Sequence, residues 1–199
     1  MSRYPGYYID QVGKGAKGWV FVLTQGDAYR DQVYEISSKF PRDWVSDNWK
    51  RKLSITSVAR SKGKWLIVMS RAETISKQAY RLASKFDPAW VRARADEGFV
   101  LTDVDSDKDY VLHTVTQFDA RRIDALTLTS SSAPTREIRE AWSKGFAVTS
   151  VGYLEAERKW AVGMAKVEAR DQAFWEGPYL PTDWIKERWA DGFSMTAIR

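Results

Sequence analysis

A seven-residue stretch, Gly98-Phe99-Val100-Leu101-Thr102-Asp103-Val104, opens a pattern that returns along the whole chain. Its counterparts are Gly6-Tyr7-Tyr8-Ile9-Asp10-Gln11-Val12, Leu53-Ser54-Ile55-Thr56-Ser57-Val58, Gly145-Phe146-Ala147-Val148-Thr149-Ser150-Val151 and Gly192-Phe193-Ser194-Met195-Thr196-Ala197-Ile198. The copies follow one another at a period of 46 to 47 residues. Such a period is the sequence signature of repeat arrays and propellers, in which each repeat is one supersecondary unit. The five copies therefore bound four complete units.

Two further apolar runs follow the opening stretch in each unit. The second run begins at an aromatic residue, and the third begins at a glutamine in three of the four units. The heads of the second run are Trp19, Trp65, Tyr110 and Trp160, and those of the third are Gln32, Gln78 and Gln172. All three runs are short, rich in β-branched and aromatic residues, and separated by turn residues, which indicates strands.

A helix is expected at the end of each unit. Proline stands at positions 41, 134 and 181, where it suits a first helical turn. Apolar residues four apart follow, as in Val45 and Trp49, and a glycine then stands where a helix C-terminus favours a left-handed residue. Each unit is therefore predicted to be β-β-β-α. We expect helix-to-sheet packing from the repeated tryptophans Trp44, Trp49, Trp90, Trp142, Trp184 and Trp189.

The predicted architecture is mainly β with short helices, in one domain that spans residues 1–199. Its units cover residues 6–51, 52–97, 98–144 and 145–191, and residues 192–199 form a closing strand. We expect a closed four-bladed ring like a small β-propeller. The run from Trp65 to Met69 is apolar throughout, as in a strand covered on both faces, and the chain starts and ends on copies of one strand. An open or irregular sheet is the alternative.

The composition excludes several classes of protein. Of 199 residues, 44% are hydrophobic and 29% charged, which suits a globular domain with a core. The absence of cysteine and the single histidine remove disulfides, thiolate metal sites and most imidazole chemistry. Because no run of 18 apolar residues and no apolar leader is present, we expect a soluble, intracellular, cytoplasmic protein without membrane contact. This inventory implies no catalysis, no cofactor and no metal.

Two motifs look like ligand-binding loops and are better explained as hairpins. Residues 13–18 match a kinase glycine-rich loop, yet the same turn in other units has unrelated chemistry and no further kinase element follows. Residues 103–109 carry an aspartate at every second position, but Lys108 and Thr114 stand where an EF-hand needs glycine and glutamate. We therefore expect an ordinary hairpin turn at the first motif and a solvated acidic turn at the second.

Few residues remain as candidates for binding. Nine of the ten tryptophans occupy repeated positions, whereas Trp175 lies outside the pattern in a segment with glycine and proline. Trp175 is the candidate for an exposed recognition loop, with core filling as the alternative. In a ring the first strands line the channel, which adds the candidates Asp10, Thr56, Thr102 and Thr149.

Other polar residues are given structural interpretations. The formal net charge of +5 is mild, and the basic residues, Arg60 among them, are expected on a solvated rim. His113 lies among apolar neighbours, which favours a satisfied core or edge position. The third unit lacks the Trp/Gln pair of the others, and its role is open.

The repeat also carries a family resemblance. It rests on Ile55-Thr56-Ser57-Val58, the run from Trp65 to Ser70, Asp31-Gln32-Val33-Tyr34, Phe40-Pro41, Trp44-Val45 and Trp49, with copies in units two and four. These motifs resemble the C-terminal region, of unknown function, that follows the catalytic domain of plant casein-kinase-I-like protein kinases. The resemblance covers nearly the whole chain, which lacks a kinase domain. It implies a non-catalytic module that docks substrates or partners, and it transfers no site residues.

Two functional hypotheses follow. The first is a non-catalytic repeat scaffold that binds a protein partner. The alternative is a protein that binds a small ligand, a glycan or a nucleic acid at the channel mouth, or a carboxylate-based enzyme there. Nucleic acid is compatible with the charge but not favoured, and the oligomeric state is not predicted.

Overall fold

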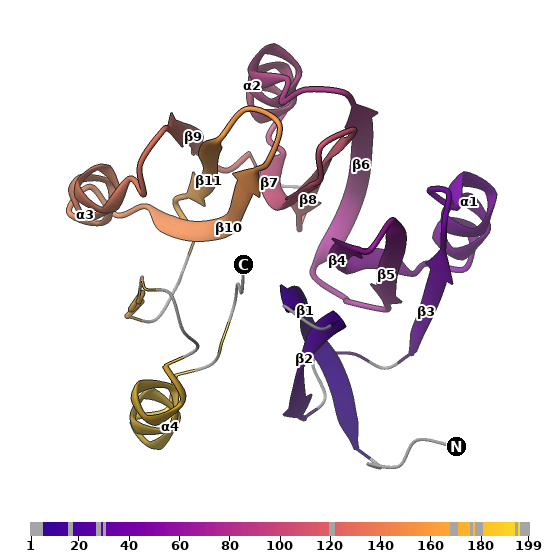
Figure 1. Ribbon diagram of the computed structural model, residues 1–199, viewed down its shortest axis with the longest axis horizontal. Coiled ribbons are helices and arrows are strands. Elements are labelled where there is room, and N and C mark those ends of the chain that lie inside the picture. The colour runs from indigo at the N-terminus through magenta and orange to yellow at the C-terminus, as the bar shows by residue number, and fades with distance from the viewer. Residues whose placement is uncertain are drawn as a thin grey trace.

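The computed structural model describes residues 6–15, 18–26, 29, 31–119, 122–167, 171–175, 177, 181–193 and 195. The chain is mainly β with short helices and forms four small antiparallel sheets of two or three strands (Figure 1). The strands are β1 (Tyr7–Gly15), β2 (Gly18–Gln25), β3 (Gln32–Ser37), β4 (Ser54–Ser61), β5 (Lys64–Ser70), β6 (Ile75–Ala83), β7 (Val100–Ser106), β8 (Val111–Phe118), β9 (Ala125–Ser130), β10 (Ala147–Leu154) and β11 (Lys159–Ala165). The helices are α1 (Arg42–Lys50), α2 (Pro88–Asp96), α3 (Thr135–Trp142) and α4 (Thr182–Ala190).

The predicted β-β-β-α order is confirmed in the first three units. In the fourth unit the prediction is wrong for the described part of the third run, because residues 171–175 follow β11 without forming a strand. The helix ends match the prediction, since Gly98, Gly145 and Gly192 have φ values of 88°, 80° and 84°. The prolines at 41, 134 and 181 precede their helices as N-caps rather than occupying the first turn.

The sheets are offset from the sequence units. Each three-stranded sheet takes its first two strands from one unit and its outer strand from the unit before, in the orders β4-β5-β3, β7-β8-β6 and β10-β11-β9. Gln32 lies opposite Ser70, and Gln78 lies opposite Thr116 in the next sheet. Only two strands, β1 and β2, form the first sheet in the described part of the chain. Consecutive units are therefore joined by shared sheets.

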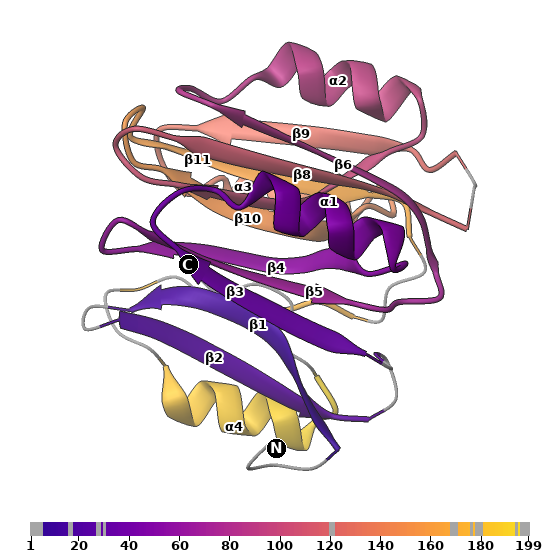
Figure 2. The ribbon, with the colours of Figure 1, turned by 90° about the vertical axis from the view of Figure 1, so that its right-hand side faces the viewer.

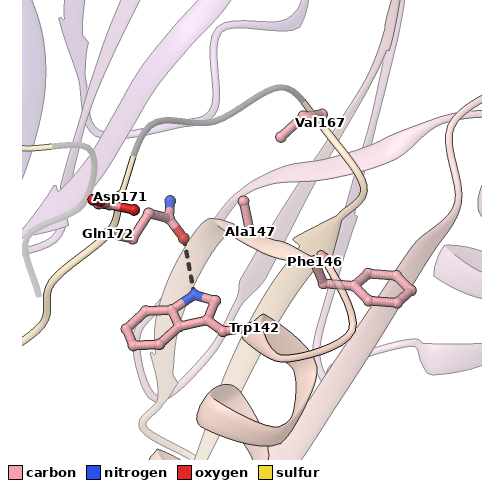
Figure 3. A pocket seen from close by; sticks show the side chains of 7 residues that line it. Trp142, Phe146, Ala147, Val167, Asp171 and Gln172 are labelled. Atoms are coloured by element: carbon pink, nitrogen blue, oxygen red, sulfur yellow. Dashed lines mark hydrogen bonds between the residues drawn. The ribbon is translucent and has the colours of Figure 1, made fainter.

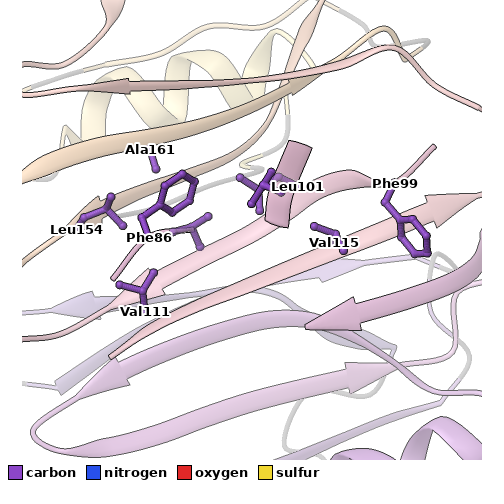
Figure 4. Packing of buried hydrophobic residues seen from close by; sticks show 9 residues of the cluster. Phe86, Phe99, Leu101, Val111, Val115, Leu154 and Ala161 are labelled. Carbon is purple, nitrogen blue, oxygen red and sulfur yellow. The ribbon is translucent and has the colours of Figure 1, made fainter. Parts of the chain in front are cut away.

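The second strands of units two to four are covered on both faces, as predicted, whereas β2 of unit one leaves Phe21 and Leu23 exposed. In β5, the residues from Trp65 to Ser70 are all buried, and β8 and β11 are almost as enclosed. One core cluster joins neighbouring sheets, because Leu154 and Ala161 of the fourth unit pack with Phe86, Leu101 and Val111 (Figure 4). Burial of this apolar surface between adjacent sheets is the main stabilising contribution that their packing makes.

The four sheets follow one another around a common centre, with β1, β4, β7 and β10 nearest to it (Figure 1). The strands of successive sheets run in similar directions (Figure 2). An ion pair between Lys14 on β1 and Glu155, just after β10, links the first unit to the fourth. The predicted closing strand, residues 192–199, falls mostly outside the described residues. Among the residues that the structure describes, none belongs to a helix long and apolar enough to span a membrane.

Candidate interaction surface

The four candidate residues of the first strands occupy one repeated position. Each inner strand has a β-bulge, and the extra residue is Asp10, Thr56, Thr102 or Thr149. A bulge leaves one residue outside the regular ladder and re-aims its side chain. The sequence pattern located this position in every unit but did not reveal the bulge.

The bulge side chains form hydrogen bonds within the fold. The hydroxyl of Thr56 bonds to that of Ser70 at 2.8 Å, and Thr102 repeats the contact with Thr116 at 2.8 Å. Thr24 donates to Asp10 at 3.1 Å in the same way. The counterpart in the fourth unit is Ala165, which has no hydroxyl, and Thr149 instead donates to a backbone carbonyl of β7, that of Leu101, at 2.8 Å. These contacts give the candidate residues a role in joining strands.

Asp10 is the charged member of this set. Burial raises its pKa above the usual value, and the hydrogen bond from Thr24 partly offsets that effect. Burial together with the charge of Asp10 raises the pKa of Tyr29 to about 12. The pair is thus a partly enclosed carboxyl and a phenol that stays protonated near neutral pH.

The glutamines that open the third runs join consecutive elements. The side chain of Gln78 accepts from the backbone N–H of Ile55 at 2.7 Å and donates to the Ile55 carbonyl at 2.8 Å. Gln32 makes the same pair of bonds to Ile9, and Gln172 makes it to Val148. Gln172 therefore holds its predicted position although its run forms no strand. The third unit has Ala125 at this register.

The acidic hairpin has a structural role at Asp103 and Asp105, which corrects the prediction of a solvated turn for these two residues, whereas Lys108 and Asp109 at the turn itself are exposed as predicted. Asp103 and Asp105 are buried, with exposed fractions of 6% and 7%. Asp103 accepts from the backbone N–H of Val58 at 2.8 Å, and Asp105 accepts from that of Arg60. Inner strands expose one edge to the next sheet, and these carboxylates pair with donors there. In the described part of the chain, no group of three metal-ligating side chains comes together.

Arg60 does not belong to an exposed rim, contrary to expectation. Its side chain is buried and lies between the rings of Trp65 and Tyr110, at 4.7 Å and 4.9 Å from their centroids. It forms an ion pair with Asp107 of the neighbouring hairpin. A cation between two aromatic faces and beside a carboxylate is held by the fold rather than presented to a partner.

His113 is a satisfied core histidine, as predicted. It is fully buried on β8, and Nε2 accepts from the backbone N–H of Asp87 at 2.9 Å. Nδ1 lies 3.1 Å from the carbonyl of Arg81, so the neutral tautomer with the proton on Nδ1 satisfies both contacts. Burial lowers the pKa of His113 below its usual value. The chain's only imidazole is thus fixed at the N-cap of α2.

The glycine-rich motif is a hairpin, as expected. Gly15 lies opposite Gly18 at the ends of β1 and β2, and residues 16 and 17 lie outside the described residues. The strand after Gly18 excludes the strand-to-helix turn of a dinucleotide site.

Exposed large apolar side chains gather in the first and fourth units. Among the described residues they are Tyr7, Phe21, Leu23, Tyr34 and Ile36 of unit one, Tyr110 of unit three, and Tyr153, Trp175 and Trp189 of unit four. Trp175 is 41% exposed, and its assignment to a recognition loop stays a prediction. Trp189 is 52% exposed, so its predicted helix-to-sheet packing is wrong.

Two hollows lie at the fourth unit. One, of about 340 Å³, is lined by residues that include Trp142, Phe146, Asp171 and Gln172 (Figure 3). The Gln172 side chain is already bonded to the Trp142 indole at 3.1 Å, as Figure 3 shows. The other, of about 230 Å³, lies between β2 and α4 and is bordered by Phe21, Leu23 and Trp189. The apolar hollow therefore adjoins the exposed residues of both units.

Comparison with known proteins shows one matching family model and a partial match to a plant protein. The model of a family described as a domain of unknown function (DUF7477) matches residues 2–123. Casein kinase 1-like protein HD16 of Oryza sativa subsp. japonica is 34% identical over 55 residues, which is 27% of this chain and 8% of that protein. The match thus spans less than a tenth of the relative's length. No solved structure matches the chain.

Proposed function

The chain belongs to the DUF7477 family, a domain of unknown function, and we propose that it is a non-catalytic scaffold that binds a protein partner. The observation that carries the proposal is the gathering of exposed apolar side chains in units one and four. Phe21, Leu23 and Trp189 border the hollow between β2 and α4, and these three residues together with Tyr34 and Ile36 of β3 are here called the seam. Aromatic residues dominate the energetics of protein interfaces.

The proposal includes a ring. We propose that the four sheets are blades of a four-bladed propeller whose inner strands surround a centre (Figure 1). The ion pair between Lys14 and Glu155, which joins the first and last inner strands, supports this arrangement. The seam is then a gap in the outer rim of the ring between units four and one.

The chemistry of the described side chains also favours binding over catalysis. His113 is buried with both ring nitrogens engaged, and the inner carboxylates Asp103 and Asp105 serve as acceptors for backbone amides. The similarity to part of a casein kinase 1-like protein is consistent with a module that accompanies a kinase, and its place in the kinase's C-terminal repeat region is part of this proposal. Binding of a ligand at the channel mouth stays an untested prediction.

Photo-crosslinking tests the scaffold. A photoreactive amino acid is placed at position 21 in the seam and, as a matched control, at position 153, since Phe21 and Tyr153 are both exposed and Tyr153 lies outside the seam. Irradiation with the native cell extract should give a defined adduct from position 21 that excess unlabelled protein competes away, and none from position 153. Equal labelling from the two positions would refute the proposal.

A further inference from the structure

A contact between the helix of one unit and the third run of the next occurs twice within the chain in nearly the same form. Trp49 of α1 lies against Tyr80 of β6 with ring centroids 5.5 Å apart, and Trp142 of α3 lies against Phe174 at 5.6 Å. In both cases the indole also donates to the glutamine two residues before the aromatic partner, Gln78 at 3.2 Å and Gln172 at 3.1 Å. The helix of one unit therefore recognises the third run of the next unit through an aromatic ring and a glutamine.

The third such junction lacks all three residues at once. The helix α2 carries Ala95 at the tryptophan position, and it contacts β9. In β9 the glutamine position is Ala125 and the aromatic position is Thr127, as the strand register shows. The tryptophan, the glutamine and the aromatic residue are thus present together or absent together, as expected of groups that act as one contact.

The seam holds both halves of a fourth contact, but they are not joined. Trp189 of α4 stands at the tryptophan position, while Gln32 and Tyr34 of β3 stand at the other two. Trp189 is 52% exposed and Tyr34 is 61% exposed, and Ile36 on the same face is 42% exposed. Their counterparts Trp49, Tyr80 and Leu82 pack against a core cluster.

The side-chain oxygen of Gln32 can accept a further hydrogen bond from an indole. Oε1 of Gln78 and of Gln172 each accepts two hydrogen bonds, one from a backbone N–H and one from an indole. Oε1 of Gln32 accepts from the N–H of Ile9 at 2.8 Å, and no indole of the described residues reaches it. A carbonyl oxygen has two acceptor positions, so Gln32 presents the second one at the seam.

In Figure 1 the helix α4 and the strand β3 lie on opposite sides of β1 and β2, so α4 does not cover β3 of its own chain. Residues of α4 and β2 border one hollow. Trp189 borders that hollow and is exposed to solvent. The outward face of β3 is consequently left for a helix of another molecule.

We propose that the partner at the seam is a second copy of this chain, with Trp189 of one copy packed on Tyr34 and bonded to Gln32 of the other. This inference rests on the proposed function and names its partner. Each copy carries both halves of the contact, so it can be made reciprocally and close a dimer. The occupant is a helix with a tryptophan in its last turn, as in α1 and α3.

Sedimentation velocity of the full chain tests the proposal. The protein concentration runs from about 1 to about 200 µM, which brackets a micromolar dissociation constant. The mass should rise with concentration from 22.8 kDa toward twice that value. Trp189→Ala and Tyr34→Ala should each weaken association at least about tenfold, because both remove a central aromatic residue. Tyr153→Ala, an exposed tyrosine outside the seam, should associate like the wild type.

Mixing the two variants distinguishes a contact between two molecules from a contact within one molecule. Trp189→Ala retains the β3 face and Tyr34→Ala retains the α4 face, so a mixture of the two should form a heterodimer with one intact contact. Far-ultraviolet circular dichroism identifies any variant that has not folded, and Ile36→Ser then replaces Tyr34→Ala. A wild type that stays monomeric at every concentration overturns this inference. If position 21 still cross-links to a different protein, the scaffold function stands without it.

Discussion

The side chain of Gln78 accepts a hydrogen bond from the indole of Trp49 at 3.2 Å while bonding to both backbone groups of Ile55. It also donates to the hydroxyl of Thr116 at 3.1 Å on the facing strand. One side chain thus connects a helix, the inner strand of its own unit and the middle strand of the next. Gln32 makes the equivalent bonds to Ile9 and Ser70 without an indole partner, so the two glutamines form a natural comparison.

Replacing Gln78 by alanine is expected to lower the free energy of unfolding by about 2 to 4 kcal/mol, because the two Ile55 backbone groups lose their partner in a part-buried site. Gln32→Ala should lower the free energy of unfolding by about 1 kcal/mol less than Gln78→Ala does, because Gln32 has no indole partner to lose. This difference is the net value of one hydrogen bond. Urea unfolding at a concentration where the protein is monomeric measures both. Equal losses would show that the indole bond contributes no stability.

The single histidine makes stability depend on pH in a defined direction. Burial lowers the pKa of His113 in the folded state, whereas in the unfolded chain it titrates near about 6.5. Its contribution to stability is therefore complete above that value and is lost as the pH falls toward the lowered folded pKa. Within this window the free energy of unfolding should fall by about 1.4 kcal/mol per pH unit.

Urea titrations at a series of pH values measure this slope, and His113→Gln is the comparison. The amide of glutamine offers a donor for the Arg81 carbonyl and an acceptor for the Asp87 N–H without titrating. The free energy of unfolding of the variant should change less with pH between pH 7 and pH 5, the range in which an ordinary histidine changes charge. Wild type and variant with the same slope would mean that His113 is not the responsible group.

The local sequence pattern explains why the helices and strands were predicted whereas the pairing of the strands was not. The apolar run from Trp65 to Met69 marks a buried strand because side-chain periodicity depends only on neighbouring residues. Whether β3 pairs with β2 or with β5 depends on packing between units, which no local pattern carries. Equivalence between repeats likewise predicted that Trp189 would be packed like Trp49, although the neighbour that covers Trp49 has no counterpart over Trp189.

Glycine at position 163 permits a close approach between the third and fourth sheets. A β-carbon there would lie 2.6 Å from the carbonyl oxygen of Leu101 and 2.6 Å from Oγ of Ser150. Gly163→Ala should therefore destabilise the protein by about 1 to 3 kcal/mol through overpacking, measured by urea unfolding. Gly18→Ala is the matched control, because a β-carbon there meets nothing within 4 Å. A neutral Gly163→Ala would imply that the two sheets can move apart at no cost.

The last prediction separates the structural role of the acidic hairpin from a metal-binding one. Asp103→Ala leaves the buried N–H of Val58 without its acceptor and should cost about 1 to 3 kcal/mol in urea unfolding. Asp103→Ser should recover part of that loss, because Ser57 at the equivalent position accepts from Val12 at 2.9 Å. Faster hydrogen exchange at the Val58 amide in the alanine variant would locate the effect. Calcium should leave the melting temperature of the wild type unchanged, whereas a rise with added calcium would show that the hairpin binds the ion in the folded state.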